Sequence, residues 1–199
     1  MIITVAGFKG GIGKTTSAIH IAAYLNTRVP TLLIDGDANR SALEWHSRGE
    51  GLPFKVIDEK HTARHARHFD SIVIDSEARP NDRDLRTLAE GCDLLILPCT
   101  PDALSLSALI RTVDALRAMK ADHFRVALTI LPPFPSRDGD EARAILQEHG
   151  LPVFKGGVRR FVAFQKAALA GVTVDEVKGD PHAADGWQDY VDIAKQIKI

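Results

Sequence analysis

The stretch FKGGIGKTTS, residues 8–17, decides the fold of this chain. It follows the short apolar run IITVAG at 2–7 and opens a helical pattern at 14–27. Gly10, Gly11 and Gly13 allow backbone conformations that are closed to other residues, so that successive N–H groups can point inward. The N-terminus of the following helix adds partial positive charge. A strand, a glycine-rich loop and a helix in this order predict a binding site for a polyphosphate.

Within this loop, Lys14 is expected to reach the β- and γ-phosphates and the Thr15 hydroxyl to ligate Mg²⁺. The strict pattern G-x-x-x-x-G-K-[ST] requires a glycine at position 8, where this chain has Phe8. A glycine-rich turn without a ligand is the alternative, and the flanking strand and helix disfavour it. The expected nucleotide contacts from the loop are Gly10, Gly11, Ile12, Gly13, Lys14, Thr15 and Thr16.

Length, charge and cysteine content indicate the number of domains and the compartment of the protein. The chain has 199 residues, and 45% of them are hydrophobic, which suits one domain over 1–199. Its net charge is −1, so any binding of nucleic acid must depend on a local patch. Cys92 and Cys99 are interpreted as buried or half-buried thiols in a reducing compartment. There is no signal segment before the first apolar run and no apolar run near ~20 residues, and we expect a cytoplasmic protein.

Short apolar runs alternate with longer helical patterns along the whole chain. The runs at 2–7, 31–37, 71–75, 93–99 and 125–132 are almost continuously hydrophobic, as in strands buried on both faces of a parallel sheet. Weaker strand candidates are 54–58 and 152–154, and the helical patterns are 14–27, 102–120, 138–149, 161–170 and 183–197. This alternation predicts an α/β fold with a doubly wound, mostly parallel sheet and helices on both faces.

Aspartates follow two of the expected strands. Asp35 and Asp37 lie at the end of the run at 31–37, and Asp75 ends the run at 71–75. Ligands of open α/β sheets bind beyond the carboxyl ends of the strands, so Asp35 and Asp75 are candidates to hold Mg²⁺ or its waters. The alternative for each is a turn residue or a helix cap.

The nucleotide base is less clearly marked. The chain contains no N-K-x-D motif for guanine, which favours ATP over GTP. The carbonyl groups near Pro132 and Pro133 are candidates to accept a hydrogen bond from the adenine amino group.

The stretch KGGIGKTT resembles the deviant phosphate loop of the ParA/MinD family of P-loop ATPases. The resemblance implies that the early lysine, Lys9, crosses a dimer interface to the phosphates of the partner's nucleotide. It also implies that Asp37 orients or activates the attacking water, which makes Lys9, Lys14 and Asp37 the expected catalytic residues. A second ammonium near the γ-phosphate would offset charge that develops during transfer. A solvated surface lysine is the alternative for Lys9.

The likeness extends over nearly the whole chain, including LLILPCTPDALSLSAL at 94–109 and VRRFVAFQKAALAGVTVDE at 158–176. Ala38-Asn39 departs from the family, which usually has Pro-Gln there. With no segment before the first strand, no N-terminal DNA-reading domain is expected. The chain is similar to compact ParA-like members, which partition plasmids or, in the carboxysome-positioning branch, space carboxysomes.

That resemblance implies a slow ATPase that uses ATP and Mg²⁺ and is stimulated by a ParB-like or McdB-like adaptor. It also implies an ATP-bound homodimer on nonspecific DNA and therefore a nucleoid-associated protein. Arg159, Arg160 and Lys166 are the candidate DNA contacts, with scattered solvated charges as the alternative. Two other functions stay open: a P-loop phosphotransferase for a small acceptor, and a MinD-like membrane-associated ATPase.

Two further patterns are interpreted as structural. In the final helix, 183–197, the apolar residues share one face, and this face is expected to pack on the domain, so membrane binding is disfavoured. His61, His65 and His68 are expected on one solvated face of a helix, with metal binding as the alternative.

Overall fold

The computed structural model describes residues 1–7, 9–78 and 82–198. Its centre is a six-stranded sheet in the order β3-β2-β4-β1-β5-β6, and every pair of neighbouring strands is parallel. The strands are β1 (Ile2–Gly7), β2 (Thr31–Asp35), β3 (Lys55–Asp58), β4 (Ser71–Ala78), β5 (Leu94–Cys99) and β6 (Phe124–Leu128). The loops after these strands therefore emerge at the same edge of the sheet.

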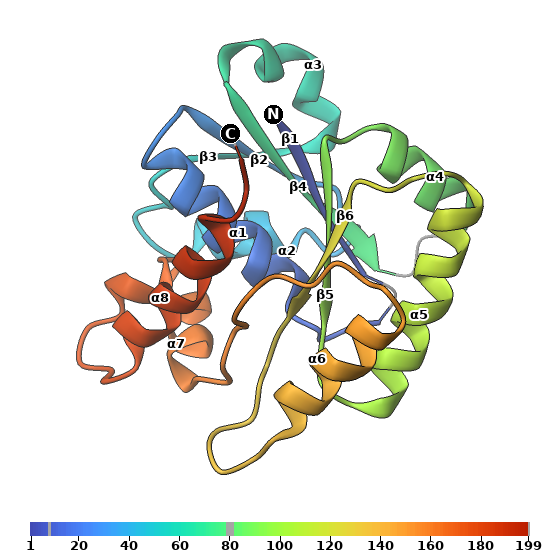
Figure 1. Ribbon diagram of the computed structural model, residues 1–199. Coiled ribbons are helices and arrows are strands. Elements are labelled where there is room, and N and C mark those ends of the chain that lie inside the picture. The colour runs from blue at the N-terminus through green and yellow to red at the C-terminus, as the bar shows by residue number, and fades with distance from the viewer. Residues whose placement is uncertain (8, 79–81, 199) are drawn as a thin grey trace.

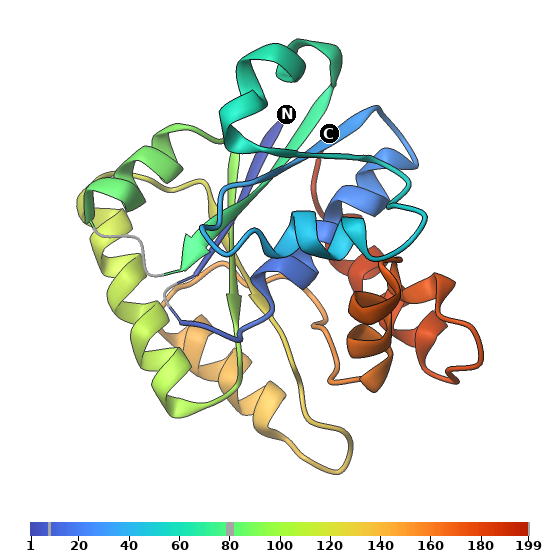
Figure 2. The ribbon, with the colours of Figure 1, turned by 180° about the vertical axis from the view of Figure 1, so that it is seen from behind.

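Helices cover both faces of this sheet (Figures 1 and 2). On one face lie α1 (Lys14–Asn26), α2 (Ser41–Ser47), α7 (Val162–Ala170) and α8 (Ala183–Ala194). On the other lie α4 (Asp82–Glu90), α5 (Ala103–Ala118) and α6 (Asp138–Glu148). The arrangement confirms the predicted doubly wound α/β fold.

The alternation of side chains along each strand builds the two cores. In β5, Leu95 and Leu97 pack with α4, α5 and α6, whereas Ile96 packs with α1 and the helices beside it. All three are essentially inaccessible to solvent. A strand buried on both faces needs apolar residues at every position, which is why the sequence runs are continuous rather than alternating.

Several expected elements have different bounds in the structure. The strand expected over 125–132 ends at Leu128, because Ile130 takes a left-handed conformation with φ 55° that no strand can continue. The strand expected over 31–37 ends at Asp35. The segment 152–154 contributes only an isolated bridge between Val153 and Val126. The helices α2 and α4 were not expected from the sequence.

The histidine-rich segment does not form the single helix that was expected. It divides into a 3₁₀ turn at Glu59–His61, the four-residue helix α3 (Thr62–His65) and a second 3₁₀ turn at Ala66–His68. Its three histidines are exposed or half-exposed. In the described part of the chain, no group of three or more His, Cys, Asp or Glu side chains is arranged to hold a metal ion.

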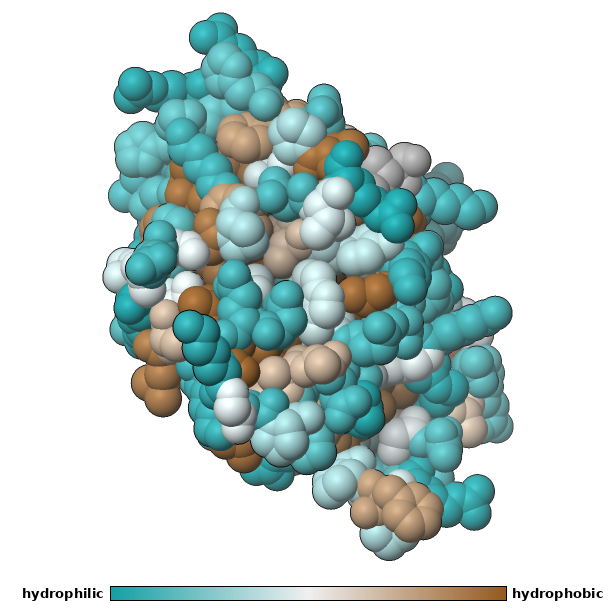
Figure 3. Space-filling view, turned by 90° about the vertical axis from the view of Figure 1, so that its left-hand side faces the viewer, coloured by the Kyte–Doolittle hydropathy of each residue, from teal (hydrophilic) through white to brown (hydrophobic). Residues whose placement is uncertain are grey.

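The C-terminal helix packs on the domain, as predicted. Tyr190, Ile193 and Ala194 of α8 are buried against α1. The side of the molecule that carries α7 and α8 is mostly hydrophilic, with apolar residues in small groups (Figure 3). Among the described residues, no helix combines the length and the apolar composition that crossing a bilayer requires.

The ends of α2 and α7 meet at two glycines. A Cβ on Gly49 would overlap the backbone at Ala170, and one on Gly171 would overlap the backbone of Gly49. Two hydrogen bonds close the same junction. The Trp45 indole N–H donates to the Val172 carbonyl at 3.0 Å, and the Arg48 guanidinium donates to the end of α7 at 3.1 Å. The absence of side chains at this point lets two backbones touch.

Candidate nucleotide site

The glycine-rich loop between β1 and α1 has the geometry that its sequence predicts at two of three glycines. Gly11 and Gly13 have φ values of 76° and 85°, in the left-handed region that favours glycine. Gly10 does not take a positive φ, and a Cβ there would meet nothing within 4 Å. The predicted backbone requirement is therefore confirmed at Gly11 and Gly13 and is wrong at Gly10. Phe8, where the strict motif has glycine, lies outside the described residues.

The loop leads directly into a helix, as expected. The helix α1 begins at Lys14, so its free N–H groups face the loop. The Thr129 hydroxyl, just after β6, donates to the Ile12 carbonyl at 2.8 Å. At the other end, the Ser17 and Tyr190 hydroxyls lie 3.0 Å apart and join α1 to α8. These two contacts hold the loop at Ile12 and the first turns of α1 at Ser17.

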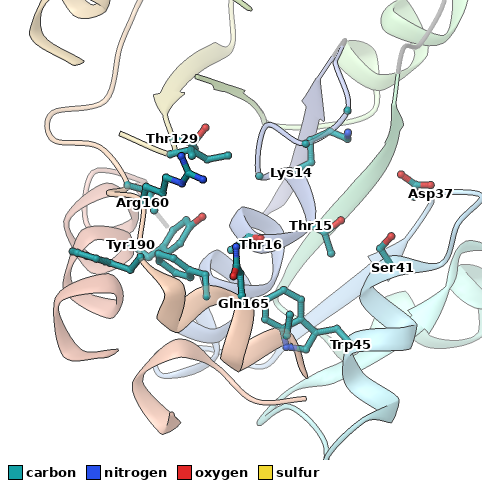
Figure 4. Close-up of a pocket in the computed structure, with 18 of the residues that line it drawn as sticks. Lys14, Thr15, Thr16, Asp37, Ser41, Trp45, Thr129, Arg160, Gln165 and Tyr190 are labelled. Atoms are coloured by element: carbon teal, nitrogen blue, oxygen red, sulfur yellow. The ribbon is translucent and has the colours of Figure 1, made fainter. Parts of the chain in front are cut away.

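A cavity of about 690 Å³ opens over this loop. That volume lies within the range typical of sites for cofactor-sized ligands. Figure 4 shows labelled side chains converging on the cavity from α1, α2, α7, α8 and the end of β6. Its lining residues are Gly10, Gly11, Gly13, Lys14, Thr15, Thr16, Asp37, Asn39, Ser41, Glu44, Trp45, Arg48, Thr129, Ile130, Val158, Arg159, Arg160, Phe161, Phe164, Gln165, Ala168 and Tyr190.

Many of the predicted site residues meet in this cavity, and others lie outside its lining. Those outside are Lys9, Ile12, Asp35, Asp75, Pro132 and Lys166. Pro132 was expected near the base, but the end of β6 contributes Thr129 and Ile130 instead. The chain turns at Ile130, so the prolines that follow leave the rim of the cavity.

The wall formed by Trp45, Phe164, Gln165 and Tyr190 was not anticipated from the sequence (Figure 4). These residues are distributed over three helices and share no local motif. The aromatic members have only the sequence signal of a position on the apolar face of a helix, which equally describes a core residue, and Gln165 is an exposed polar residue with no signal.

Asp75 is a buried carboxylate at the end of β4 and lies next to Asp35 in the strand register. Among the described residues, neither of its carboxylate oxygens has a hydrogen-bond partner. Burial raises the pKa of Asp75 to about 7; the nearby Thr15 hydroxyl and Lys14 ammonium lower the pKa, while Asp35 and Asp37 raise it. A buried, unpartnered carboxylate beside a hydroxyl is a donor set that suits a hard cation such as Mg²⁺.

Asp35 has a different environment from Asp75, although both are fully buried. One of its carboxylate oxygens accepts from the Asp37 N–H at 3.1 Å, and the other accepts from the Leu43 N–H at 2.9 Å. The second bond satisfies a free N–H in the first turn of α2. The structure thus gives Asp35 the turn and capping role that was the alternative for it. A direct metal contact would require the loss of one of these bonds.

Asp37 lies on the wall of the cavity and is almost completely buried. Its Oδ1 atom accepts two hydrogen bonds from Asn39, from the backbone N–H at 2.8 Å and from the side-chain amide at 3.0 Å. These contacts fix the orientation of the carboxylate. The residue is therefore a rigid acceptor on the same cavity as Lys14 and Thr15.

Lys9 points away from the cavity. Its Nζ atom donates to Asp102 Oδ1 at 3.2 Å and to Ser105 Oγ at 3.1 Å. The side chains of Lys9 and Asp102 are 41% and 47% exposed. In the single chain, this ammonium therefore lies at the start of α5 rather than over the phosphate loop.

The three basic residues predicted to contact DNA differ in their surroundings. Arg159 forms a bidentate pair with Asp189, with nitrogen–oxygen distances from 2.9 to 3.1 Å. Lys166 pairs with Asp180 at 2.8 Å. Arg160 is exposed on the rim of the cavity, and within 1–7, 9–78 and 82–198 no carboxylate pairs with it. Of the three, Arg160 is the cation most available to a ligand.

Comparison with known proteins identifies the family of this chain. Residues 3–174 match the profile of CbiA, the CobQ/CobB/MinD/ParA nucleotide binding domain. The chain belongs to this family. The match covers the phosphate loop, both aspartate-bearing strands and the end of β6. Membership in the family agrees with the resemblance to ParA/MinD ATPases that the loop sequence indicated.

Similar members of the family come from several bacteria. Maintenance of carboxysome distribution protein A from Gloeobacter kilaueensis is 31% identical over 202 residues, covering 98% of this chain and 93% of that protein. Protein ParA from Rhizobium radiobacter is 26% identical, covering 77% and 76% of the two chains. Among solved structures, a Cyanothece McdA–ATP complex superimposes with a TM-score of 0.73 at 20% identity, covering 100% and 97%. The likeness to the McdA structure shows that the two proteins share a fold.

Proposed function

We propose that this member of the family is an ATPase that positions an intracellular cargo over the nucleoid. ATP would bridge two subunits, the dimer would bind nonspecific DNA, and a cargo-bound adaptor would accelerate hydrolysis and release. The observation that carries the proposal is the meeting of the Lys14–Thr15 loop and Asp37 on one cavity, with the unpartnered Asp75 beside Thr15. The relative named for carboxysome distribution favours a carboxysome over a plasmid as the cargo, because it matches a larger share of the chain at higher identity.

The triphosphate would be held by the N–H groups of 10–13 and the start of α1, with the Lys14 ammonium at its terminal phosphates. Thr15 and Asp75 would hold Mg²⁺, which when bound neutralises charge on the β- and γ-phosphate oxygens. The fit is supported by the burial of the Asp75 carboxylate, whose charge needs a partner. Asp35 would act indirectly, because both its oxygens are engaged in the fold.

Asp37 would orient the attacking water. Its Oδ1 is held by Asn39, so the carboxylate cannot rotate freely and the other oxygen is left to accept a proton from water. In the family motif this neighbour is a glutamine two positions after the aspartate. In this chain the residue at that position is Asn39, and it holds the carboxylate of Asp37.

The dimer is the part of the proposal that depends on Lys9. Lys9 lies outside its own cavity, and in the proposed dimer it would reach a phosphate of the other copy and offset the charge of the transition state. Dimerisation would also double the contribution of Arg160 to a basic surface, with a correspondingly steep dependence of DNA binding on salt.

Two measurements on the purified chain test the proposal. Light scattering after size exclusion, with Mg²⁺ and a slowly hydrolysed ATP analogue, is expected to show a dimer for the wild type and a monomer for Lys9→Ala. Lys14→Ala is the control that removes nucleotide binding itself. ATP turnover is expected to be slow and to change when nonspecific DNA and the adaptor are added. An analogue-bound monomer in both the wild type and Lys9→Ala would contradict the dimer.

Turnover with a small acceptor and sedimentation with liposomes separate the two alternatives. A phosphotransferase would turn over rapidly only with a small acceptor and would not respond to DNA. A membrane-associated switch would sediment with anionic liposomes in the presence of ATP. Liposome binding is not expected, because α8 buries its apolar residues against α1.

A further inference from the structure

The segment between β3 and β4 gathers positive charge that the nucleotide site does not use. Residues 60–68 have the sequence KHTARHARH, in which six of nine residues are Lys, Arg or His and none is Asp or Glu. In the whole chain, Asp and Glu total 26 and Lys and Arg total 25, so this stretch departs clearly from the average. Lys60, Arg64 and Arg67 are exposed, and we call these three residues the basic ridge.

The fold does not neutralise the charges of the basic ridge. Within 1–7, 9–78 and 82–198, no carboxylate forms an ion pair with Lys60, Arg64 or Arg67. The Arg67 guanidinium donates to the ring of the next residue at 3.3 Å, which leaves its charge in place. Asp58, just before the segment, pairs with Arg40 instead at 3.1 Å. The three cations of the ridge are therefore available to an anionic ligand.

The surroundings of His65 show how positive this surface is. Lys55 Nζ, at the start of β3, lies 3.1 Å from His65 Nδ1. Desolvation and the nearby positive charge of Lys55, Arg64, His61 and His68 lower the pKa of His65 below its usual value. Positive groups that stand this close repel one another, and a bound anion would remove part of that repulsion.

This surface is remote from the nucleotide site. The helix α3, which carries Arg64, stands at the end of the molecule where β1 and β4 begin (Figures 1 and 2). The N-terminal ammonium of Met1 donates to the Asp70 carbonyl at 2.7 Å, which ties the end of the segment to the start of β1. The phosphate loop follows the opposite end of β1, and Arg160 lies on the cavity there. A ligand of the ridge therefore does not compete with the nucleotide.

We propose that the basic ridge is a second binding surface for the phosphate backbone of duplex DNA, separate from Arg160 and independent of bound nucleotide. Guanidinium and ammonium groups are the side chains that bind phosphate oxygens most strongly. A lipid surface or a protein partner would call for apolar groups among these charges. Among the described residues, the large exposed apolar side chains all lie outside 60–68: Leu104, Phe134, Ile145, Val162 and Leu169.

The expected contact is weak and depends on salt. Three phosphate contacts would make the logarithm of the binding constant fall with the logarithm of the salt concentration with a slope of about −3. Because the ridge needs neither ATP nor a second subunit, a subunit that has lost its nucleotide would still bind DNA weakly. This property goes beyond the proposed function, in which DNA binding belongs to the ATP-loaded dimer.

The test uses the nucleotide-free full chain and a short labelled duplex of arbitrary sequence. Binding is followed by fluorescence anisotropy over a range of salt concentrations. The double variant Arg64→Gln, Arg67→Gln is expected to bind about five- to tenfold more weakly at low salt and to have a slope smaller by about two. The matched control, Arg111→Gln with Lys120→Gln, removes the same charge from exposed positions elsewhere and should change neither quantity.

A second variant separates charge from structure. Arg64→Lys with Arg67→Lys keeps both charges, so it should keep the salt slope of the wild type. Urea unfolding of all variants checks that the fold is unchanged. Weak binding by the lysine variant at wild-type stability would overturn the proposal, because the positive charge would not be what binds DNA.

Other results would also overturn the basic ridge. These are a nucleotide-free chain that does not bind the duplex at low salt, and a glutamine variant that binds it like the wild type. If that variant instead loses binding to phosphatidylglycerol vesicles or to polyglutamate, the ridge serves a membrane or an acidic protein. None of these outcomes touches the proposed function, which is tested separately with Arg160→Ala in the analogue-loaded protein.

Discussion

His20 lies face to face with Tyr190 in the core, with ring centroids 4.8 Å apart and planes inclined by 13°. Its Nε2 accepts from the Val174 N–H at 3.0 Å, so the neutral ring carries its proton on Nδ1, which lies 2.7 Å from the Thr16 carbonyl. The histidine thus joins the first turn of α1 to the segment before α8. Complete burial lowers its pKa from 6.5 to about 4.

This shift predicts a loss of stability in mild acid. Because the unfolded state takes up a proton near pH 6.5 and the folded state only near pH 4, the stability from His20 is complete above about pH 6.5 and falls as the pH drops toward 4. Between pH 8 and pH 5 the expected loss is about 2 kcal/mol.

Asp75 contributes a pH dependence of the opposite sign. Its folded pKa of about 7 exceeds the usual 3.8, so its contribution is most favourable below about pH 4 and is lost as the pH rises through 7. From pH 8 to pH 5 the nucleotide-free protein regains about 2 to 3 kcal/mol from this group. The two terms nearly cancel, and the wild type is expected to show little net change in its free energy of unfolding.

The substitution Asp75→Asn separates the two terms. At pH 8 it is expected to stabilise the nucleotide-free chain by about 1 to 3 kcal/mol, because a buried charge is replaced by an amide that still lacks partners. It should also expose the His20 term as a loss of about 2 kcal/mol on going to pH 5. Urea unfolding of both proteins at the two pH values measures these changes. A flat pH profile for Asp75→Asn would contradict the assignment to His20.

The raised pKa of Asp75 predicts that Mg²⁺ and protons compete for its carboxylate. Since its carboxyl group is half protonated near pH 7, the Mg²⁺ dependence of nucleotide binding should strengthen about tenfold from pH 6 to pH 8. Calorimetric titration of the ATP analogue at several Mg²⁺ concentrations checks this. The Asp75→Asn variant provides the control, and it should bind weakly at both pH values. An equal Mg²⁺ requirement at pH 6 and pH 8 in the wild type would remove Asp75 from the metal site.

Asp37→Asn is expected to separate binding from hydrolysis. The amide keeps an oxygen that can accept from Asn39 but cannot take a proton, so ATP turnover should fall about 10²- to 10⁴-fold while analogue affinity changes little. Single-turnover hydrolysis and equilibrium binding measure the two quantities. The matched control is Asn39→Ala, which leaves the carboxylate unheld and should reduce turnover by less than Asp37→Asn. Normal turnover in Asp37→Asn would show that Asp37 does not accept the proton of the attacking water.

The two adjacent arginines are expected to behave differently in DNA binding. Arg160→Ala should weaken binding of the analogue-loaded protein to nonspecific duplex and reduce the salt slope by about one per subunit. Arg159→Ala should act mainly on folding, because its guanidinium already pairs with Asp189. Salt titrations of DNA binding, together with urea unfolding, distinguish these effects. If Arg159→Ala weakens DNA binding more than Arg160→Ala does and keeps its stability, Arg159 rather than Arg160 contacts DNA.

The sequence predicted the fold more completely than the site because the signals of the fold are local. A buried parallel strand is one continuous apolar run, and the phosphate loop is ten consecutive residues, so both can be recognised without knowing what lies nearby. The boundary of β6 was missed because the left-handed conformation of Ile130 is unusual for a β-branched residue.

The wall of the cavity could not be predicted for the converse reason. Trp45, Gln165 and Tyr190 are more than 140 residues apart at the extremes and meet only through the packing of three helices. Asp35 and Asp75 looked equivalent in the sequence, since each ends a strand. The fold distinguishes them, because one carboxylate lies within reach of the free N–H groups of a helix and the other does not.

The junction of Gly49 and Gly171 has a consequence for the shape of the cavity. The helices that meet there, α2 and α7, both contribute to one wall of the cavity, so this backbone contact sets how closely the two parts of the wall approach. A methyl group at either position would act as a wedge and push the ends of the two helices apart. A single substitution outside the cavity lining would therefore change the shape of the cavity.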